Sequence, residues 1–331
     1  MIIVRVPLRI SFVGGGSDLP AFYNQSTGRV ISAAIDKYVF VAINEKFDGK
    51  FRIGYSVTEL VDKPHEVKNT RVRAAFEHFG VDRGLEVVSI ADVPSSGSGL
   101  GASSSFSVAL MHGLGEFLGK PHKDKYAVAE DACRLEMEML GEKIGKQDQY
   151  AAAFGGVNVM EFMPTGVTVK PVRLSKKHLT EFHSHLALFH VGGIRSAADY
   201  SSTLAGNLAG DKEKFLAQKE MADAVIPFKS SLMKGDYRAL GRMLSESWEL
   251  KKKTSSGIST AAIDGIYATG MENGAWGGKL LGAGGGGFML FIVSPRNRKK
   301  LCTALSHIRE VPFGFDVEGS KVVFSRFKGV V

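Results

Sequence analysis

The stretch PSSGSGLGASSS, residues 94–105, stands between a predicted strand and a predicted helix. Leu85–Ile90 alternates apolar and polar residues like a half-buried strand, and apolar residues recur at helical spacing over 106–117. Glycines let a backbone approach a phosphate closely, and the free N–H groups at a helix start favour anions. The stretch therefore predicts a phosphate-binding turn. The alternative is a plain serine-capped helix, but three glycines alternating with small residues exceed what a cap needs.

The composition describes a compact protein. Its 331 residues correspond to about two domains, and 44% apolar with 23% charged residues excludes a disordered or fibrous chain. The longest apolar run, Phe288–Val293, is far shorter than a membrane helix, and residues 1–10 do not resemble a signal peptide. Cys133 and Cys302 lie in no CxxC pattern, which argues against a local zinc site or a disulfide. We expect a cytoplasmic monomer or homodimer with no membrane partner.

The net charge of +8 favours anionic partners. Nucleic acid is not the expected anion, because the densest basic runs, Lys251–Lys253 and Arg296–Lys300, are short and have no interleaved aromatic residues. The net charge does not indicate which class of anion binds, so the sequence motifs have to indicate it.

The order of predicted elements is mixed. The predicted strands are 2–13 with an interruption at Pro7, Val30–Ile35, Tyr38–Ile43, Leu85–Ile90, a hairpin over 157–174, Leu186–Val191, Phe288–Val293 and 321–327. The predicted helices are 103–117, 123–141, 149–154, 211–225, 236–251, 259–273 and 296–308. The sequence predicts an α+β fold of two packed layers, divided at the polar stretch 175–185 into domains 1–180 and 181–331.

A second glycine tract, residues 282–287, satisfies GxGxxG. A dinucleotide-binding unit requires a helix after this pattern, but here the apolar strand Phe288–Val293 follows. The tract is better explained as backbone that lets a neighbouring loop or phosphate come close. A plain turn into a strand is the alternative, and it would not need five glycines.

Two acidic residues are candidates for chemistry. Asp148 stands at a turn into a short helix, where it suits contact with a substrate hydroxyl, although a simple N-cap explains it equally well. Glu136 lies twelve residues earlier in the preceding helix, and both it and Glu138 could be ordinary solvent-facing carboxylates.

Near the N-terminus, a strand runs into a glycine turn closed by an acid. Arg9 on the strand and Asp18 after Gly14–Gly16 suit a site where an arginine meets a transferring phosphate and a carboxylate meets sugar hydroxyls. An ordinary surface arginine is the alternative.

Four segments in this order resemble the GHMP kinase superfamily over nearly the whole chain. They are PLRISFVGGGSDL (7–19), PSSGSGLGASSSFSVAL (94–110), LEMEMLGEKIGKQDQY (135–150) and GGKLLGAGGGGFML (277–290). The resemblance implies a ribosomal-protein-S5-like N-terminal domain and a ferredoxin-like C-terminal domain, with ATP and Mg²⁺ bound in the cleft between them.

The resemblance also implies roles for single residues. Asp148 and Arg9 would be catalytic, and Ser103 with Glu136 would bind Mg²⁺. The ATP phosphates would lie against Pro94, Gly97, Ser98, Gly99, Leu100, Gly101, Ala102, Ser103 and Ser104, supported by Gly284 and Gly285. The acceptor would contact Gly15, Gly16, Asp18 and Arg195.

The chain departs from the superfamily pattern at two places. Galactokinases carry a Glu-His pair where this chain has Gly15-Gly16, which argues against galactose. The second motif reads GLGASSS instead of GLGSSA, so Ser103 or Ser104 could be the metal ligand, and the register favours Ser103.

The glycine turn at 14–18 and GKQDQYAAAFGG (145–156) are most similar to the bacterial D-glycero-α-D-manno-heptose 7-phosphate kinases, which act at C1. This resemblance implies a phosphorylated sugar as substrate, and Arg195 is the basic residue expected at its phosphate. A kinase for fucose, galactose or an isoprenoid alcohol such as mevalonate, or a nucleotide-binding regulator without turnover, are the alternatives.

Overall fold

The computed structural model describes residues 1–93, 97–193 and 197–326, and its larger sheet has eight strands. These strands are β1 (Ile2–Val13), β2 (Gly28–Glu45), β3 (Phe51–Gly54), β4 (Thr58–Val61), β5 (Leu85–Ala91), β6 (Val157–Met163), β7 (Gly166–Pro171) and β12 (Lys321–Ser325). The order is β12-β1-β2-β5-β3-β4, and β6 adds to β2 with β7 at its outer edge. All pairs are antiparallel except β3 with β5.

Strand β2 is one continuous element of 18 residues, so the two separate strands expected over this stretch are wrong. Its first part, Gly28–Ala33, pairs with β6, and Val39–Glu45 pairs with β5, while β1 runs along its other side. Pro7 does not interrupt β1 either. The ladder shifts register between Pro7 and Leu8, which accommodates the residue that has no N–H to donate.

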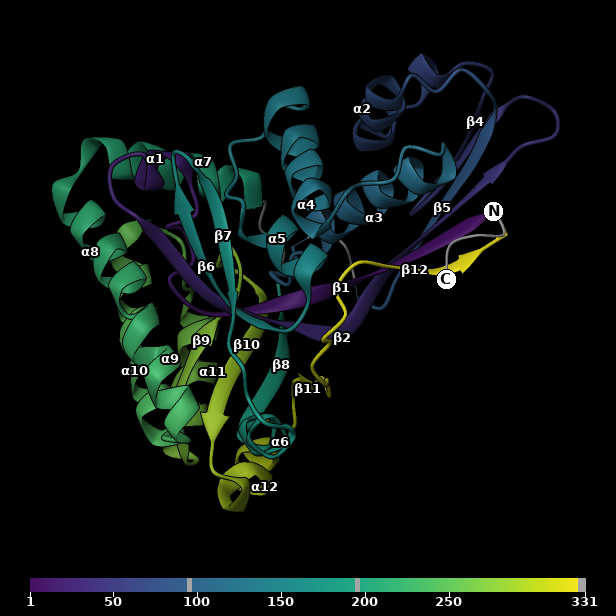
Figure 1. Ribbon diagram of the computed structural model, residues 1–331. Helices are drawn as coiled ribbons and strands as arrows, with labels where there is room; N and C mark the ends of the chain where they lie inside the picture. Colours follow the sequence, from purple (N-terminus) through teal and green to yellow (C-terminus); the bar gives the residue numbers. More distant parts are fainter. Residues whose placement is uncertain (94–96, 194–196, 327–331) are drawn as a thin grey trace.

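Helices cover one face of this sheet (Figure 1). They are α2 (Thr70–Phe79), α3 (Ala102–Phe117), α4 (Lys125–Cys133), the π-helical η2 (Arg134–Met139) and α5 (Gln147–Phe154). Helix α3 lies across β1 and β2 and buries Val108, Leu110 and Leu114 in the larger core. The helix expected over 123–141 is thus two elements, because the backbone widens into a π turn after Cys133.

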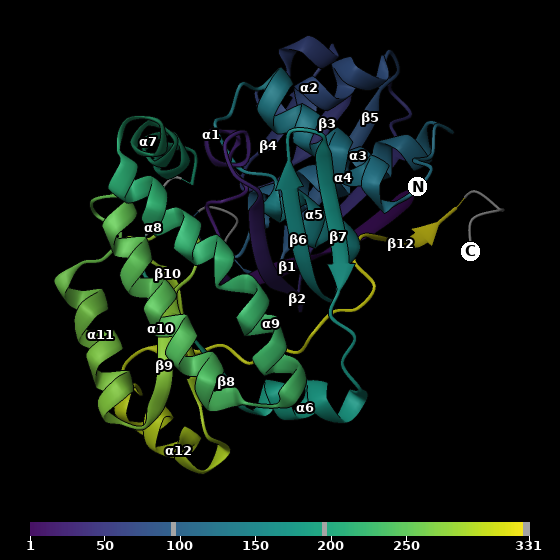
Figure 2. The ribbon, with the colours of Figure 1, turned by 60° about the vertical axis from the view of Figure 1, so that its left-hand side comes forward.

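The second sheet is antiparallel, in the order β11 (Arg309–Glu310), β8 (Leu186–Gly192), β10 (Gly287–Val293) and β9 (Ala275–Leu280). Its helices are α6 (Lys176–Ser184), α7 (Ala197–Gly210), α8 (Lys212–Asp223), α9 (Val225–Lys234), α10 (Tyr237–Thr254), α11 (Ala261–Glu272) and α12 (Pro295–Ala304). Helices α10 and α11 pack on β9, and α8 and α9 lie beside α10 (Figure 2). Every residue of β10 is buried, which explains its unbroken apolar sequence.

The α+β class is confirmed, as are the strand at Leu85–Ile90 and the hairpin of β6 and β7. Helices α6, α7 and α9 and strand β9 are not predicted from the sequence. Strand β9 contains Gly277 and Gly278, which reduce its strand signal. A Cβ atom on Gly277 would lie 1.8 Å from the carbonyl oxygen of Gly241 in α10, so close helix packing requires a glycine there.

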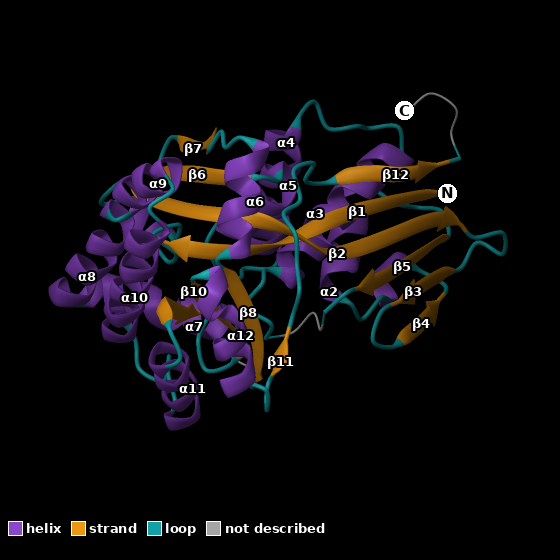
Figure 3. Ribbon diagram, turned by 90° about the horizontal axis from the view of Figure 1, so that it is seen from below, coloured by secondary structure: helices purple, strands orange, loops and turns teal. Residues whose placement is uncertain are grey.

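Two chain segments cross between the sheets. Strand β12 pairs with β1, so residues beyond 181 contribute to the larger sheet (Figure 3). Helix α1 (Pro20–Tyr23) follows the first glycine turn and buries Phe22 in the core of the second sheet, where its ring stacks on Phe215 at 5.0 Å. The turn that precedes α1 is therefore held against the second sheet.

Both cysteines are free, as expected. No helix in the described part of the chain has the length and apolar character needed to cross a membrane.

Candidate active site

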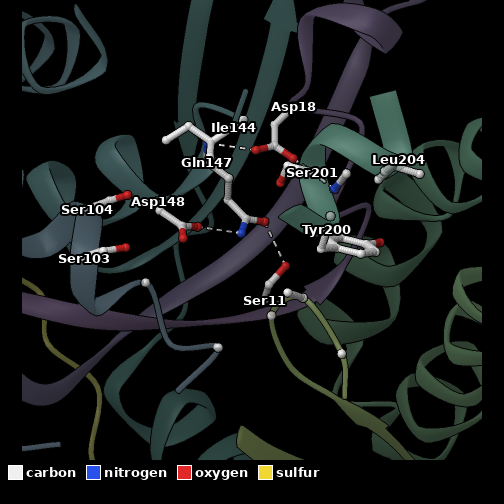
Figure 4. Close-up of a pocket in the computed structure, with 18 of the residues that line it drawn as sticks. Ser11, Asp18, Ser103, Ser104, Ile144, Gln147, Asp148, Tyr200, Ser201 and Leu204 are labelled. Atoms are coloured by element: carbon white, nitrogen blue, oxygen red, sulfur yellow. Dashed lines mark hydrogen bonds between the residues drawn. The ribbon is translucent and has the colours of Figure 1, made fainter. Parts of the chain in front are cut away.

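A cavity of about 480 Å³, a volume typical of small-molecule sites, contains most of the candidate residues. Its walls come from β1, β9, the starts of α3 and α5, and helices α7, α8 and α10. In Figure 4, Ser103 and Ser104 lie on one side of Asp148, and Asp18, Tyr200 and Ser201 lie on the other. The cavity is thus bounded by both sheets and their helices.

The glycine- and serine-rich turn forms the side of the cavity at the start of α3. Gly101 is the N-cap residue with φ of +78°, and no side chain caps the helix. The serine-capped alternative is therefore wrong, because the serines at 103–105 lie within the helix. Uncapped N–H groups at a helix start leave donors and a positive dipole end for an anion.

The second glycine tract packs directly on this turn. A Cβ atom on Gly282 would lie 2.2 Å from the Cα of Gly99, and one on Gly287 would lie 2.6 Å from the Ser98 carbonyl oxygen. Both clashes are with backbone, so the two loops can approach this closely only as glycines. The tract leads into β10, which excludes the dinucleotide-binding interpretation.

Arg9 and Asp148 form an ion pair in the middle of the cavity. Arg9 Nε donates to Asp148 Oδ1 and Nη2 donates to Oδ2, both at 2.8 Å, while Nη1 donates at 2.6 Å to the Gly99 carbonyl oxygen. Arg9 is only 5% exposed, so it is not a surface arginine. The N-cap of α5 is Lys146, and the Asp148 side chain bonds to Arg9, so the simple N-cap interpretation of Asp148 is wrong as well.

Gln147 connects the Arg9–Asp148 pair to Ser11 and to Asp18 in the first glycine turn. Its amide nitrogen Nε2 donates to Asp148 Oδ1 at 3.0 Å, and its Oε1 accepts from Ser11 Oγ at 2.8 Å (Figure 4). Its backbone N–H donates at 3.0 Å to Asp18 Oδ2, and Asp18 Oδ1 accepts from the Gly16 N–H at 2.9 Å. Burial raises the pKa of Asp18, and these two N–H bonds oppose the rise. Asp18 therefore fixes the glycine turn against α5 while lining the cavity.

Glu136 is fully buried in the π-helical turn η2. Its Oε1 accepts from Ser107 Oγ at 2.8 Å, and its Oε2 accepts from Ser104 Oγ at 3.0 Å and from the Gln149 side-chain amide. Arg71 Nη2 lies 3.3 Å from Oε1. The solvent-facing alternative is thus excluded for Glu136, whereas the Glu138 side chain is 75% exposed.

Of the two neighbouring serines 103 and 104, Ser104 is the one that donates to Glu136. Successive residues of a helix point about 100° apart, so only one of two neighbouring serines can face a given group. Ser103 lines the cavity one position earlier.

Comparison with known proteins places the chain in a family. The GHMP kinases N terminal domain model matches residues 67–156, and the GHMP kinases C terminal model matches residues 228–308. A relative from Campylobacter jejuni named D-glycero-alpha-D-manno-heptose 7-phosphate kinase is 32% identical over 96% of this chain and 97% of its own length. The chain belongs to the GHMP kinase family. Family members are ATP-dependent phosphotransferases, so the chain is a kinase, and the family's two-domain α+β architecture is confirmed.

Solved structures match this GHMP kinase along nearly its whole length. A Bacteroides thetaiotaomicron protein described as a D-glycero-D-manno-heptose 1-phosphate kinase has a TM-score of 0.81 and 26% identity, covering 98% of this chain and 100% of that one. A putative sugar kinase from Campylobacter jejuni has a TM-score of 0.76 and 31% identity, with 97% of both chains covered.

Most of the remaining site residues expected from the sequence line the cavity, and a few do not. Gly15, Gly16, Gly97, Ser98, Gly99, Gly101, Ala102 and Gly284 line it. Leu100 does not, since it is fully buried in the larger core and its carbonyl accepts from the Arg9 N–H. Gly285 is absent from the lining too, and its N–H donates to the Ile258 carbonyl at 2.9 Å. Pro94 and Arg195 lie outside the described residues.

Three cations of the cavity were not found from the sequence: Arg71, Lys251 and Lys279. Arg71 pairs with Glu142 and Arg9 pairs with Asp148, and Asp18 is a third carboxylate in the cavity lining. For Lys279 the available signal was a lysine directly before Leu280-Leu281 and the second glycine tract. Lys251 belongs to the basic run Lys251–Lys253, which suggested no site, and nothing in the local sequence marks Arg71.

Proposed function

We propose that this kinase transfers the γ-phosphoryl group of ATP to the C1 hydroxyl of a D-glycero-D-manno-heptose 7-phosphate. The Arg9–Asp148 pair carries the proposal, because it lies between the phosphate-binding turn and the glycine turn expected to hold a sugar. The names of two relatives, both of which give a heptose phosphate, support this acceptor class.

In the proposed reaction, the acceptor oxygen forms a bond to the γ-phosphorus while the bond from that phosphorus to the β–γ bridging oxygen breaks. The electron pair of the broken bond leaves with ADP. Asp148 orients the acceptor hydroxyl and takes its proton, and Arg9 fixes Asp148 relative to the nucleotide loop through the Gly99 carbonyl. Because the transition state of phosphoryl transfer is loose, positioning and charge neutralisation contribute more than proton abstraction.

We propose that Mg²⁺ binds at Glu136, whose carboxylate is held in the free protein by Ser104, Ser107, Gln149 and Arg71, so that the ion would replace the Ser104 hydrogen bond. Mg²⁺ is usually held by one or two carboxylates together with phosphate oxygens, and Glu136 with the hydroxyl of Ser104 supplies such a set beside the phosphate turn. The buried Gln149 Oε1 has no hydrogen-bond partner among the described residues, which leaves a further hard oxygen there. Bound Mg²⁺ would neutralise charge on the β- and γ-phosphates. We propose Ser104 and Glu136 as its ligands, with Ser103 toward the phosphates.

On the other side of Asp148, the sugar would contact the turn at Gly15, Gly16 and Asp18. Each Asp18 carboxylate oxygen accepts one backbone N–H and keeps a lone pair for a hydroxyl. Ser201 and Tyr200 of α7 close this end of the cavity. Such a set of polar groups suits a polyhydroxylated acceptor.

The experiment is ADP release from Mg·ATP with heptose 7-phosphate, galactose, fucose, mevalonate and homoserine, and Asp148→Ala as the blank. We expect turnover with heptose 7-phosphate, and phosphorus NMR of the product should show a new phosphate at C1. Preferred turnover of an unphosphorylated acceptor would contradict the proposed substrate, and nucleotide binding without turnover would favour a regulator.

A further inference from the structure

Lys279, on β9, is a buried cation that the proposed reaction does not use. It is 4% exposed and lines the cavity. Its Nζ donates at 2.7 Å to the backbone carbonyl of Phe12, which lies on β1 between Ser11 and the first glycine turn. The ammonium group is therefore held against the β1 backbone one residue after Ser11, which lines the same cavity.

The charges around Lys279 are unbalanced. Arg9 is the charged neighbour that acts on it, and the charge of Arg9 is already matched by Asp148. Lys251 lines the same cavity from α10, the helix that packs on β9. Among the described residues, Lys279 forms no ion pair with a carboxylate. Burial and then Arg9 lower the pKa of Lys279 to about 7.

We propose that Lys279, as an ammonium ion, binds a phosphate group of a ligand in this cavity. The inference rests on the proposed function, since it needs a phosphate-bearing ligand at the site. The phosphate is either the terminal phosphate of the nucleotide or the phosphate that the acceptor already carries. Either one would supply the negative charge that Lys279 lacks, and a buried charged hydrogen bond of this kind is strong.

A consequence is that binding takes up a proton. In the free protein at pH 8, a lysine with this lowered pKa is mostly neutral. An adjacent phosphate favours the charged form and raises that pKa, so Nζ gains a proton from solvent. We expect about 0.9 proton per bound phosphate at pH 8, falling toward zero near pH 6, where Lys279 is already charged.

Isothermal titration calorimetry in buffers of different ionisation enthalpy measures this uptake directly. The probes are ADP, the β,γ-imido analogue of ATP, heptose 7-phosphate and inorganic phosphate, each with Mg²⁺ at pH 8. The variants are Lys279→Arg, which keeps the charge but does not titrate, and Lys279→Met, which has a similar length and no charge. Comparison with Lys279→Arg removes any proton that the ligand itself exchanges.

We expect the wild type to take up about 0.9 proton more than either variant at pH 8. Lys279→Met should bind the relevant probe about 10- to 100-fold more weakly, and Lys279→Arg should bind within about tenfold of the wild type. Uptake with the ATP analogue identifies the nucleotide phosphate, and uptake with heptose 7-phosphate alone identifies the acceptor phosphate. Equal uptake in Lys279→Met would contradict the proton uptake assigned to Lys279, and binding of every probe by Lys279→Met as tightly as by the wild type would overturn the proposal.

A loss of binding in Lys279→Met has to be distinguished from a failure of the variant to fold. Exchange of a buried lysine for methionine removes a desolvation cost, so Lys279→Met should fold. If it does not fold, the second measurement is NMR of wild-type protein that carries ¹³C at the lysine ε-carbons. The pKa of Lys279 is then compared with and without the bound probe. An equal pKa in the two states contradicts the inference. Turnover that persists without uptake removes only the role of Lys279, whereas no binding of any probe removes the proposed function too.

Discussion

Asp148 is the residue on which the proposed reaction depends most directly. Asp148→Asn keeps the size of the side chain but loses the carboxylate that pairs with Arg9 and orients the acceptor hydroxyl. We expect kcat to fall by about 100-fold or more while the ADP dissociation constant stays within about twofold. Steady-state kinetics and calorimetry measure both. The exposed Asp82→Asn is the control, and near-normal turnover of Asp148→Asn would exclude the catalytic role.

Glu136 offers a second test at the scale of one side chain. Glu136→Gln removes the buried negative charge that would hold Mg²⁺ beside Ser104. We expect the Mg²⁺ concentration for half-maximal turnover to rise by about tenfold or more. The matched control is Glu138→Gln, which changes an exposed carboxylate two residues away. The same metal dependence in both variants would remove Glu136 from the proposed metal site.

At the scale of elements, the glycine- and serine-rich turn before α3, which we propose binds phosphate, depends on close contact with the second glycine tract. Gly282→Ala would place a methyl group 2.2 Å from the Cα of Gly99, so one loop must move. We expect the KM for ATP to rise by about tenfold or more, with a lower melting temperature. The control is Gly265→Ala in α11, where the added methyl meets open space and should stabilise the helix by about 0.5–1 kcal/mol. An unchanged KM in Gly282→Ala would show that this contact does not shape the nucleotide site.

The elements also explain which secondary structure could be predicted. Strand β5, helix α3 and the β6–β7 hairpin follow from local periodicity and turn residues. Strand β9 does not, because its two glycines are required by packing, Gly277 against α10 and Gly278 against the Phe291 ring of β10, and not by strand propensity. The undivided length of β2 likewise depends on three partner strands that a local pattern does not reveal.

Over the whole molecule, the two sheets share cores and a cavity. The larger hydrophobic cluster includes Phe228, Leu281 and Leu290 from the second half of the chain, and β12 returns to pair with β1. We propose that residues 1–180 and 181–331 are nevertheless the two domains, with β12 as a strand that crosses back. In this arrangement the cavity at their junction places the nucleotide turn opposite helices α7 and α10.

Global stability should depend on His112, which connects α3 to the C-terminal segment. Its Nδ1 lies 2.6 Å from Ser320 Oγ, just before β12. Burial and then His122 lower the pKa of His112 to about 4. The unfolded chain therefore binds a proton that the folded state does not, and stability is lost as pH falls below the ordinary histidine value of about 6.5.

We expect this group to lower the free energy of unfolding by about 3 kcal/mol between pH 6.5 and pH 4. Urea denaturation over this range for the wild type and His112→Asn measures the contribution as a difference in slope. Removal of the titrating ring should flatten the profile even if the variant is less stable overall. Parallel profiles for the two proteins would contradict the assignment.

The sequence by itself determined the glycine- and serine-rich turn between β5 and α3, the order of the main elements, the α+β class and the family. It could do so because backbone freedom at glycines, amphipathic periodicity and the donors of a helix start depend on residues that are neighbours in the chain. Asp148 and Glu136 were found, but their alternatives as a cap and as a surface carboxylate could not be excluded from spacing.

Only the tertiary structure decided which side chains meet. Arg9 and Asp148 are 139 residues apart, and Lys279 reaches the Phe12 carbonyl across 267 residues. The rotation of α3 against η2 decides that Ser104, and not Ser103, contacts Glu136. The way β9 lies against β1 decides that Lys279 contacts the Phe12 carbonyl. Sheet register and helix rotation are set by packing of the whole chain, so contacts of this kind are not determined by local sequence.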